Sequence, residues 1–356
     1  MTPKKTIGIV GGGQLGRMSA LAAARLGLNC VIYTPESGSP ASQVCDQTVV
    51  APYDDAVSLK RFASMVDVIT YEFENIPVET IEILKQEKPV YPDSNLLDIS
   101  QDRISEKSFL NDIGIPTARW VKVEDEEKLH ATLEEWESEA CIIKTCRFGY
   151  DGKGQIKYNK SQKLSVAIEN LHGDLIAEEI VDFSDELSVI TARDYGKNIV
   201  SYGPMLNIHK NHILHKTITP APFAQDIADQ AIEMAEKLAE KLDLTGLLTL
   251  ELFLTRDGRL LANEIAPRTH NSGHWSIDAC AVSQFENHIR AVAGQPVAPP
   301  APICPSEMLN LIGDDINTID RYLTQSGACV HLYGKDSAKP GRKMGHITFL
   351  NPTNED

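Results

Sequence analysis

The sequence of 356 residues lacks the features that mark secreted and membrane proteins. Its seven cysteines form an odd set with no Cys-x-x-Cys pair, which argues against a disulfide framework and against a zinc ribbon. No apolar run reaches the roughly 18 residues of a membrane helix, and the apolar run before Gly11 is too short for the core of a signal peptide. We therefore expect a cytoplasmic protein with reduced thiols and no membrane partner.

Positive charge is scarce as well, because 34 lysines and arginines are set against 50 aspartates and glutamates, a net charge of −16. Such an acidic surface argues against a general nucleic-acid partner. With 42% hydrophobic and 24% charged residues the chain can bury an ordinary core, which argues against a disordered protein. The length favours two or three domains.

Three regions of different pattern follow one another along the chain. In residues 1–100, short β-branched runs alternate with helical stretches, a βαβ series that predicts a Rossmann-like, doubly wound parallel sheet. Residues 101–296 form a strand-rich α+β block that includes an amphipathic helix over 223–242. Five prolines between 294 and 305 exclude a helix or a central strand there, and a small β-rich C-terminal domain is expected over 297–356. The expected fold class is therefore mixed α/β and α+β.

The first of two glycine loops contains Gly11, Gly13 and Gly16, which follow a predicted strand and open a predicted helix. Glu36 stands 20 residues beyond Gly16, at the position of the acid that binds a ribose hydroxyl in dinucleotide-binding folds. The bare amides of a helix N-terminus bind any phosphate or carboxylate, however, and a tight turn without a ligand has the same pattern. This loop alone leaves NAD binding and several other functions open.

The second glycine loop, residues 149–154, follows a short apolar strand that ends in Lys144. Its three glycines let the backbone pass close to a polyphosphate, and Lys144, Arg147 and Lys153 supply positive charge around it. It is not a P-loop, because no Ser or Thr follows the Gly-Lys pair to hold magnesium. We therefore expect a phosphate site whose metal ion is held elsewhere, with a solvated basic hairpin tip as the alternative.

A candidate metal site lies in a predicted β-hairpin. Asp257 and Gly258 are typical of a two-residue turn, and that turn places Glu251 directly opposite Glu264, with Asn263 on the other face. Two carboxylates about 5 Å apart repel each other, so the pair destabilises the sheet unless a cation lies between them. Mg²⁺ carrying nucleotide phosphates would fit, since it takes one or two carboxylates plus phosphate oxygens. A slip of one residue would place the two glutamates on different faces.

Five sequence strings resemble those of one enzyme family. They are Gly-Gly-Gly-Gln-Leu-Gly-Arg-Met at 11–18, Tyr-Glu-Phe-Glu-Asn-Ile at 71–76, Gly-Tyr-Asp-Gly-Lys-Gly-Gln at 149–155, Asn-Glu-Ile-Ala-Pro-Arg-Thr-His-Asn-Ser-Gly-His-Trp at 263–275 and Gly-Arg-Lys-Met-Gly-His at 341–346. With the strand lysine and the Glu-Glu-Ile-Val hinge that starts at Glu178, the chain resembles the 5-(carboxyamino)imidazole ribonucleotide synthases of purine biosynthesis, in the ATP-grasp superfamily. The resemblance spans nearly the whole chain and implies that residues 101–296 are an ATP-grasp domain.

The resemblance implies an ATP-dependent carbon–nitrogen ligase with ATP and Mg²⁺ as cofactors. It implies bicarbonate and 5-aminoimidazole ribonucleotide as substrates, a homodimer, and a first glycine loop that faces the ribonucleotide and holds no NAD. The implied metal ligands are Glu251 and Glu264. The implied ATP contacts are Arg103, Lys144, Gly149, Tyr150, Asp151, Gly152, Lys153, Gly154, Gln155, Glu178, Glu179, Ile180, Val181, Glu186, Asn263 and Glu264.

The implied reaction begins with attack of bicarbonate on the γ-phosphate, giving carboxyphosphate and ADP, while Lys144 and Mg²⁺ spread the developing charge. Carboxyphosphate, or CO₂ released from it, then carboxylates the exocyclic amine of the ribonucleotide, and the second glycine loop covers the site as a lid. The expected catalytic residues are Lys144, Asp151, Arg268, His270 and Lys343. The expected substrate-binding residues are Gln14, Glu72, Tyr150, Arg268, His270, Asn271, Ser272, Arg342 and Lys343.

Three alternatives stay open at this point. Another ATP-grasp ligase would load formate or an amino acid in place of bicarbonate, and a nucleotide sensor would bind ATP without turnover. An NAD-dependent oxidoreductase would bind NADH at the first glycine loop, but it leaves the second loop and the pair of Glu251 and Glu264 without a role.

Overall fold

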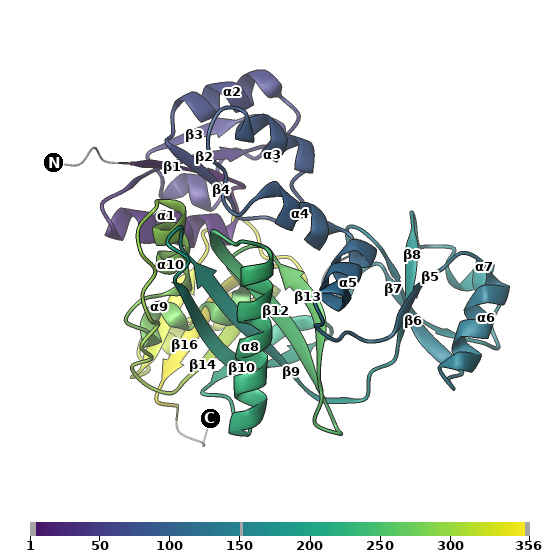
Figure 1. The fold of residues 1–356 in the computed structure, drawn as a ribbon. Helices are drawn as coiled ribbons and strands as arrows, with labels where there is room; N and C mark the ends of the chain where they lie inside the picture. The colour runs from purple at the N-terminus through teal and green to yellow at the C-terminus, as the bar shows by residue number, and fades with distance from the viewer. Residues whose placement is uncertain (1–4, 150–151, 353–356) are drawn as a thin grey trace.

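The N-terminal sheet of the computed structural model has four parallel strands in the order β3-β2-β1-β4 (Figure 1). The structure describes residues 5–149 and 152–352. Apolar residues fill both faces of this sheet, as expected for parallel strands covered by helices on two sides. The predicted Rossmann-like architecture is confirmed. Its elements are β1 (Thr6–Val10), α1 (Gln14–Arg25), β2 (Asn29–Thr34), η1 (Ala41–Gln43), β3 (Gln47–Val50), α2 (Ala56–Ser64), β4 (Val68–Tyr71), α3 (Val78–Lys85) and α4 (Ser94–Gln101).

A second, antiparallel sheet in the order β5-β8-β6-β7 stands away from the main body, at the right of Figure 1. Its helices pack their apolar residues, among them Leu129 and Leu133, against Ile143 and Tyr158 of the sheet. The second glycine loop connects β6 to β7, so it projects from the end of this sheet. The elements are β5 (Trp120–Lys122), α6 (Glu126–Glu135), β6 (Ala140–Thr145), β7 (Gln155–Asn159), α7 (Leu164–Ala167) and β8 (Leu175–Glu179).

The central sheet has eight antiparallel strands in the order β13-β12-β9-β10-β11-β14-β16-β15. The three C-terminal strands continue this sheet, because β14 pairs with β11, β16 pairs with β14, and β15 pairs with β16. The region after the prolines is therefore hydrogen-bonded to the rest of the central sheet. None of the helices within the described residues is long and apolar enough to cross a membrane. The elements are β9 (Phe183–Arg193), β10 (Ile199–Lys210), β11 (Ile213–Thr219), α8 (Gln225–Lys241), β12 (Gly246–Thr255), β13 (Leu260–Ala266), η2 (Asn271–Gly273), α9 (Ser276–Ala279), α10 (Gln284–Val292), β14 (Ser306–Ile312), η3 (Gly313–Thr318), α11 (Asp320–Leu323), β15 (Ala328–Leu332) and β16 (Lys343–Leu350).

Helix α5 (Arg103–Asp112) lies between the central body and the outlying sheet (Figure 1). Asp102 caps the helix, because its side chain accepts hydrogen bonds from the amides of Ile104 and Ser105. The helix packs against β13 of the central sheet. This arrangement fixes Arg103, in the first turn, beside the strand that carries Glu264.

Candidate active site

A cavity of about 1330 Å³ lies where the three sheets meet. Its wall includes Glu72 after β4, Lys144 on β6, Glu178 on β8 and Glu251 on β12, so every sheet contributes. The cavity brings together most of the predicted site residues: Gln14, Glu72, Arg103, Lys144, Gly149, Gly152, Lys153, Gln155, Glu178, Glu179, Ile180, Val181, Glu186, Glu251, Asn263, Glu264, Arg268, His270, Asn271, Arg342 and Lys343.

Two of the predicted site residues that the structure describes do not reach the cavity wall. Ser272, expected to contact substrate, is fully buried behind His270, and its hydroxyl is 2.8 Å from His270 Nδ1. Gly154, expected to contact ATP, closes the β6–β7 hairpin, because its carbonyl oxygen accepts a hydrogen bond from the Thr145 amide. A Cβ atom at Gly154 would collide with the Thr145 hydroxyl. Tyr150 and Asp151 lie outside the described residues.

The hairpin of β12 and β13 pairs Glu251 with Glu264, but not through the predicted turn. The amide and hydroxyl of Thr255 bond to Arg259, so the loop between them has three residues and ends at Gly258 with a φ of +84°. The predicted two-residue turn is therefore wrong. A β-bulge further along, where the register shifts between Glu251 and Leu252, absorbs the extra residue and restores the predicted pairing.

Asn263 is the extra residue of the bulge, because it lies between the pair Ala262–Leu252 and the pair Glu264–Glu251. Residues 263–266 all contribute to the cavity wall, so the wall does not separate the two faces of this strand. That the Asn263 side chain faces away from Glu264 therefore stays a prediction.

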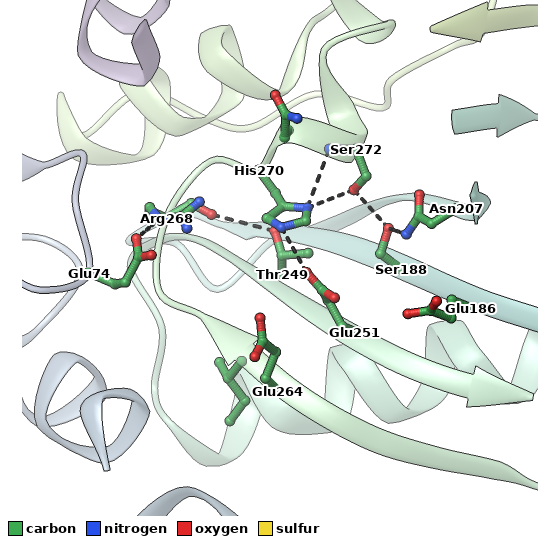
Figure 2. Close-up of polar contacts among 12 residues, drawn as sticks. Glu74, Glu186, Ser188, Asn207, Thr249, Glu251, Glu264, Arg268, His270 and Ser272 are labelled. Carbon is green, nitrogen blue, oxygen red and sulfur yellow. Dashed lines mark hydrogen bonds and ion pairs between the residues drawn. The ribbon is translucent and has the colours of Figure 1, made fainter. Parts of the chain in front are cut away.

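Each of the two facing glutamates has a basic side chain beside it. His270 Nε2 lies 2.8 Å from Glu251 Oε1, and Arg103 lies 3.6 Å from Glu264 Oε2. Burial opposes ionisation of both carboxyls; the ion pair with His270 outweighs it and lowers the pKa of Glu251, whereas burial and the charge of Glu251 raise the pKa of Glu264. A divalent cation would relieve this mutual repulsion, so the pair suits Mg²⁺. Figure 2 shows both carboxylates directed into one space.

His270 is held from two sides. Its Nε2 meets Glu251, and its Nδ1 meets the Ser272 hydroxyl, which is itself 2.8 Å from the hydroxyl of Ser188 (Figure 2). Asn207 donates from Nδ2 to the Ser188 hydroxyl at 2.8 Å. This buried polar chain holds the plane of the imidazole, and Ser272 acts on the site through His270 in this structure.

Arg268 joins the segment after β13 to the segment after β4 through an ion pair with Glu74. The neighbouring Glu72 accepts hydrogen bonds from the amides of Gly13 at 2.8 Å and Gly16 at 3.3 Å. The Glu72 side chain therefore occupies the amides of the helix N-terminus where a dinucleotide phosphate would bind, and burial raises the pKa of this carboxyl group. This contact removes the structural basis for NAD binding at the first glycine loop.

Lys144 Nζ lies 2.9 Å from Glu178 Oε2. Burial and the nearby charges of Arg103 and Lys107 lower the pKa of Lys144 although Glu178 favours its charged form.

Lys107 is a buried partner of Glu178 that sequence analysis missed, because a lysine within a helix carries no sign of its burial. Stacked rings of Phe183 and Phe253, with centroids 4.6 Å apart, also lie in the cavity wall and were not predicted.

Three cations from the C-terminal region line the cavity: Lys335, Arg342 and Lys343. The ammonium group of Lys335 donates to the backbone oxygen of Lys343 at 2.7 Å. Burial, followed by the charge of Arg342, lowers the pKa of Lys335 to about 8. Sequence analysis missed Lys335, which stands eight residues before Lys343 on the other side of a loop.

The three regions of the chain match models of three domain families. Residues 4–101 match the ribonucleotide synthetase preATP-grasp domain, residues 108–285 the ATP-grasp domain, and residues 306–356 the phosphoribosylaminoimidazole carboxylase C-terminal domain. The N5-carboxyaminoimidazole ribonucleotide synthase of Brucella melitensis is 47% identical over 99% of this chain and 98% of its own length.

Solved structures agree with this. The ADP complex of an N5-carboxyaminoimidazole ribonucleotide synthetase superposes with a TM-score of 0.94 at 40% identity, covering 100% of this chain and 94% of that one. The Aspergillus clavatus enzyme in complex with ADP and 5-aminoimidazole ribonucleotide has a TM-score of 0.91 at 31% identity, covering 99% and 95%. The oxidoreductase alternative is therefore wrong, and the chain belongs to the N5-carboxyaminoimidazole ribonucleotide synthase family of ATP-grasp ligases, the family that its motifs resemble.

Proposed function

We propose that the cavity is the site at which this chain carries out the reaction of its family, the ATP-dependent carboxylation of 5-aminoimidazole ribonucleotide, with bicarbonate as the source of carbon. One observation carries the assignment: the opposed carboxylates Glu251 and Glu264 share one cavity with cations from two sheets. Lys144 on β6 suits a nucleotide phosphate, and Arg342, just before β16, suits the phosphate of the ribonucleotide, because guanidinium binds phosphate in a bidentate manner.

ATP would lie between the outlying sheet and the β12–β13 hairpin that carries Glu251 and Glu264. The strand end at Glu179 and the residues that follow, Ile180 and Val181, offer backbone groups to the adenine edge, and the stacked Phe183 and Phe253 offer an apolar surface beside it. Lys144, Arg103 and the second glycine loop would then surround the phosphates. A relative that superposes over the whole chain is an ADP complex, which supports nucleotide binding by this chain.

Mg²⁺ would be held by Glu251 and Glu264, with phosphate oxygens as further ligands. The unfavourable pairing of two facing carboxylates in this structure is the observation that fits a cation. When bound, the ion would offset negative charge on the phosphates during transfer. Asn263, beside them on the bulge, would contact ATP.

The chemistry has two displacement steps. In the first, an oxygen of bicarbonate attacks the γ-phosphorus and ADP leaves, which yields carboxyphosphate. In the second, the exocyclic amine of the ribonucleotide attacks the carbonyl carbon, the bond to phosphate breaks, and the amine loses a proton. Arg268, His270 and Asn271 would hold the bicarbonate; Asn271 Oδ1 is buried and has no hydrogen-bond partner among the described residues.

The ribonucleotide would lie between the first glycine loop and the C-terminal cations. Arg342, Lys343 and Lys335 would bind its 5′-phosphate, and Gln14 and Glu72 would face its base. We also keep Tyr150 and Asp151 as proposed contacts to the imidazole and its amine. Asp151 and Lys343 retain the catalytic roles that the family resemblance implies for them.

The test is release of ADP from Mg-ATP in the presence of bicarbonate and the ribonucleotide, with each component omitted in turn. We expect ADP to form at full rate only when all are present. Lys343→Ala should raise the KM for the ribonucleotide far more than the KM for ATP. Equal effects on both KM values would remove Lys343 from the phosphate site, and ADP release that ignores the ribonucleotide would contradict the proposed reaction.

A homodimer is proposed from the family resemblance, and a cytoplasmic location from the odd set of unpaired cysteines. Analytical ultracentrifugation should give the mass of two chains at micromolar concentration. A mass of one chain would reject the dimer without affecting the assignment of the cavity.

A further inference from the structure

Lys107 is a buried lysine that belongs to the same charge cluster as Lys144. It lies in the second turn of α5, and its side chain is 1% exposed. Its Nζ is 3.5 Å from Glu178 Oε2 and 3.5 Å from the backbone oxygen of Asn263. These contacts explain how an ammonium group can be removed from water, since a buried charge without partners is strongly unfavourable.

Glu178 is shared between two lysines. Lys144 and Lys107 both approach its Oε2, at 2.9 Å and 3.5 Å, so the cluster has two ammonium groups for one carboxylate. Burial opposes ionisation of Glu178, but the lysines outweigh it and lower the pKa of Glu178 to about 2. Glu178 is therefore ionised and has Lys107 as a second ion-pair partner besides Lys144.

The two lysines differ in their access to the cavity. Lys144 lies in the wall, whereas Lys107 does not. Lys107 also contacts the backbone of β13 at Asn263, which ties it to the central sheet. The contacts of Lys107 with Glu178 and with the backbone of Asn263 do not depend on the side chain of Lys144, and Lys107 lies behind the cavity wall.

We propose that Lys107 is a positioning residue: as the resident counter-ion of Glu178, it allows Lys144 to turn from Glu178 to the phosphates of the nucleotide. Without Lys107, the same movement would leave the buried carboxylate of Glu178 with neither lysine and with only the more distant charge of Arg103, which is a costly state. With Lys107 in place, Glu178 stays paired while Lys144 binds phosphate. This inference rests on the proposed ATP site, because it assigns a purpose to the second lysine of that site.

The test compares the binding of ADP and adenosine by calorimetry in the full-length protein. The ratio of the adenosine Kd to the ADP Kd measures what the phosphates contribute. Lys107→Met keeps the length of the side chain and removes its charge, and Glu178 still has Lys144, so the variant should fold. We expect the ratio to fall about tenfold or more, because Lys144 remains held by Glu178.

A second background separates this role from a general loss of charge. Glu178→Gln removes the carboxylate that holds Lys144, so adding Lys107→Met to Glu178→Gln should change the ratio by less than about twofold. Lys160→Met is the matched control, because it removes a positive charge that pairs with Glu134 away from the cavity. This control should leave the ratio unchanged.

Three outcomes would overturn the proposal. Equal weakening of adenosine and ADP by Lys107→Met would make Lys107 a structural residue. The same loss in the Glu178→Gln background would make it a distant charge that acts independently of Glu178. A wild-type protein that did not bind ADP would remove the proposed ATP site itself, a failure visible before any variant is made. If circular dichroism shows Lys107→Met to be unfolded, Lys107→Gln takes its place in the same comparison.

Discussion

The two glycine loops look alike in sequence and differ in what surrounds their backbone. At the first loop, the amides of Gly13 and Gly16 donate to the carboxylate of Glu72. At the second, Gly149 and Gly152 open on a cavity whose wall contains Lys144. A glycine pattern thus encodes a backbone that another group can approach closely, but residues distant in sequence decide whether that group is a phosphate or a carboxylate of the protein.

The difference assigns the two loops to different parts of the reaction. The second loop, with Lys144 beside it, is proposed to bind the nucleotide. The first loop positions Glu72 toward the cavity, and the phosphate of the other substrate is left to the C-terminal cations, which include Arg342. Variants on each side should therefore affect different Michaelis constants.

The largest effect is expected from Lys144→Met. Removing the ammonium group from the second loop's strand should lower kcat/KM for ATP by about 10²- to 10³-fold, because it would stabilise charge that develops on the transferred phosphate. Steady-state ADP release measures this. Lys160→Met, just beyond β7 in the same sheet, is the control and should stay within twofold of wild type. A comparable loss in both variants would contradict a specific role for Lys144.

Glu72→Ala tests the first loop. We expect the KM for the ribonucleotide to rise about tenfold and the KM for ATP to stay within twofold, because Glu72 faces the ribonucleotide side and its loss releases the Gly13 and Gly16 amides. Substrate titrations of ADP release check both values. Glu79→Ala, an exposed acid in α3, is the control. A larger rise in the ATP KM would break the division between the loops.

The pH dependence of ribonucleotide use should sharpen the same division. Burial and then Arg342 lower the pKa of Lys335 to about 8, although Glu72 and Glu36 favour its charge and Lys343 opposes it. The lysine is charged below that pH and loses its proton as the pH rises through it. We therefore expect kcat/KM for the ribonucleotide to fall several-fold between about pH 7 and 9, since this parameter reports the free enzyme.

Lys335→Arg is the discriminating variant for that profile, because a guanidinium stays charged throughout the range. It should flatten the alkaline fall and leave the ATP profile unchanged. An identical fall in Lys335→Arg would assign the titration to another group.

Local patterns predicted most of the fold, because they depend on neighbours in sequence. The alternation of strands and helices before residue 100 gave the parallel sheet, and the amphipathic period over 223–242 gave α8 (Gln225–Lys241). The pairing of Glu251 with Glu264 was also predicted, but through two errors that cancel: the loop is one residue longer than expected, and the bulge takes that residue up again.

Contacts between segments that are far apart in the chain could not be predicted from the sequence. Nothing in a glycine-rich turn indicates that Glu72, more than fifty residues away, will occupy its amides. Lys107 and Lys335 likewise look like ordinary surface lysines until the fold buries them. These three residues depend on tertiary packing, which one sequence alone does not reveal.

The smallest effect is expected from Gly258→Ala, at a glycine that has no part in either loop. Its φ of +84° disfavours a side chain, but a Cβ there would meet no atom within 4 Å, so backbone strain alone counts. Urea unfolding should show a loss of about 1 kcal/mol, while kcat/KM for both substrates stays unchanged. The bulge lies between the turn and the pair of Glu251 and Glu264, so we expect a change in the turn to leave the pairing of the two glutamates intact. A fall in kcat would mean that the turn, and not the bulge, determines which residues of the two strands pair at Glu251 and Glu264.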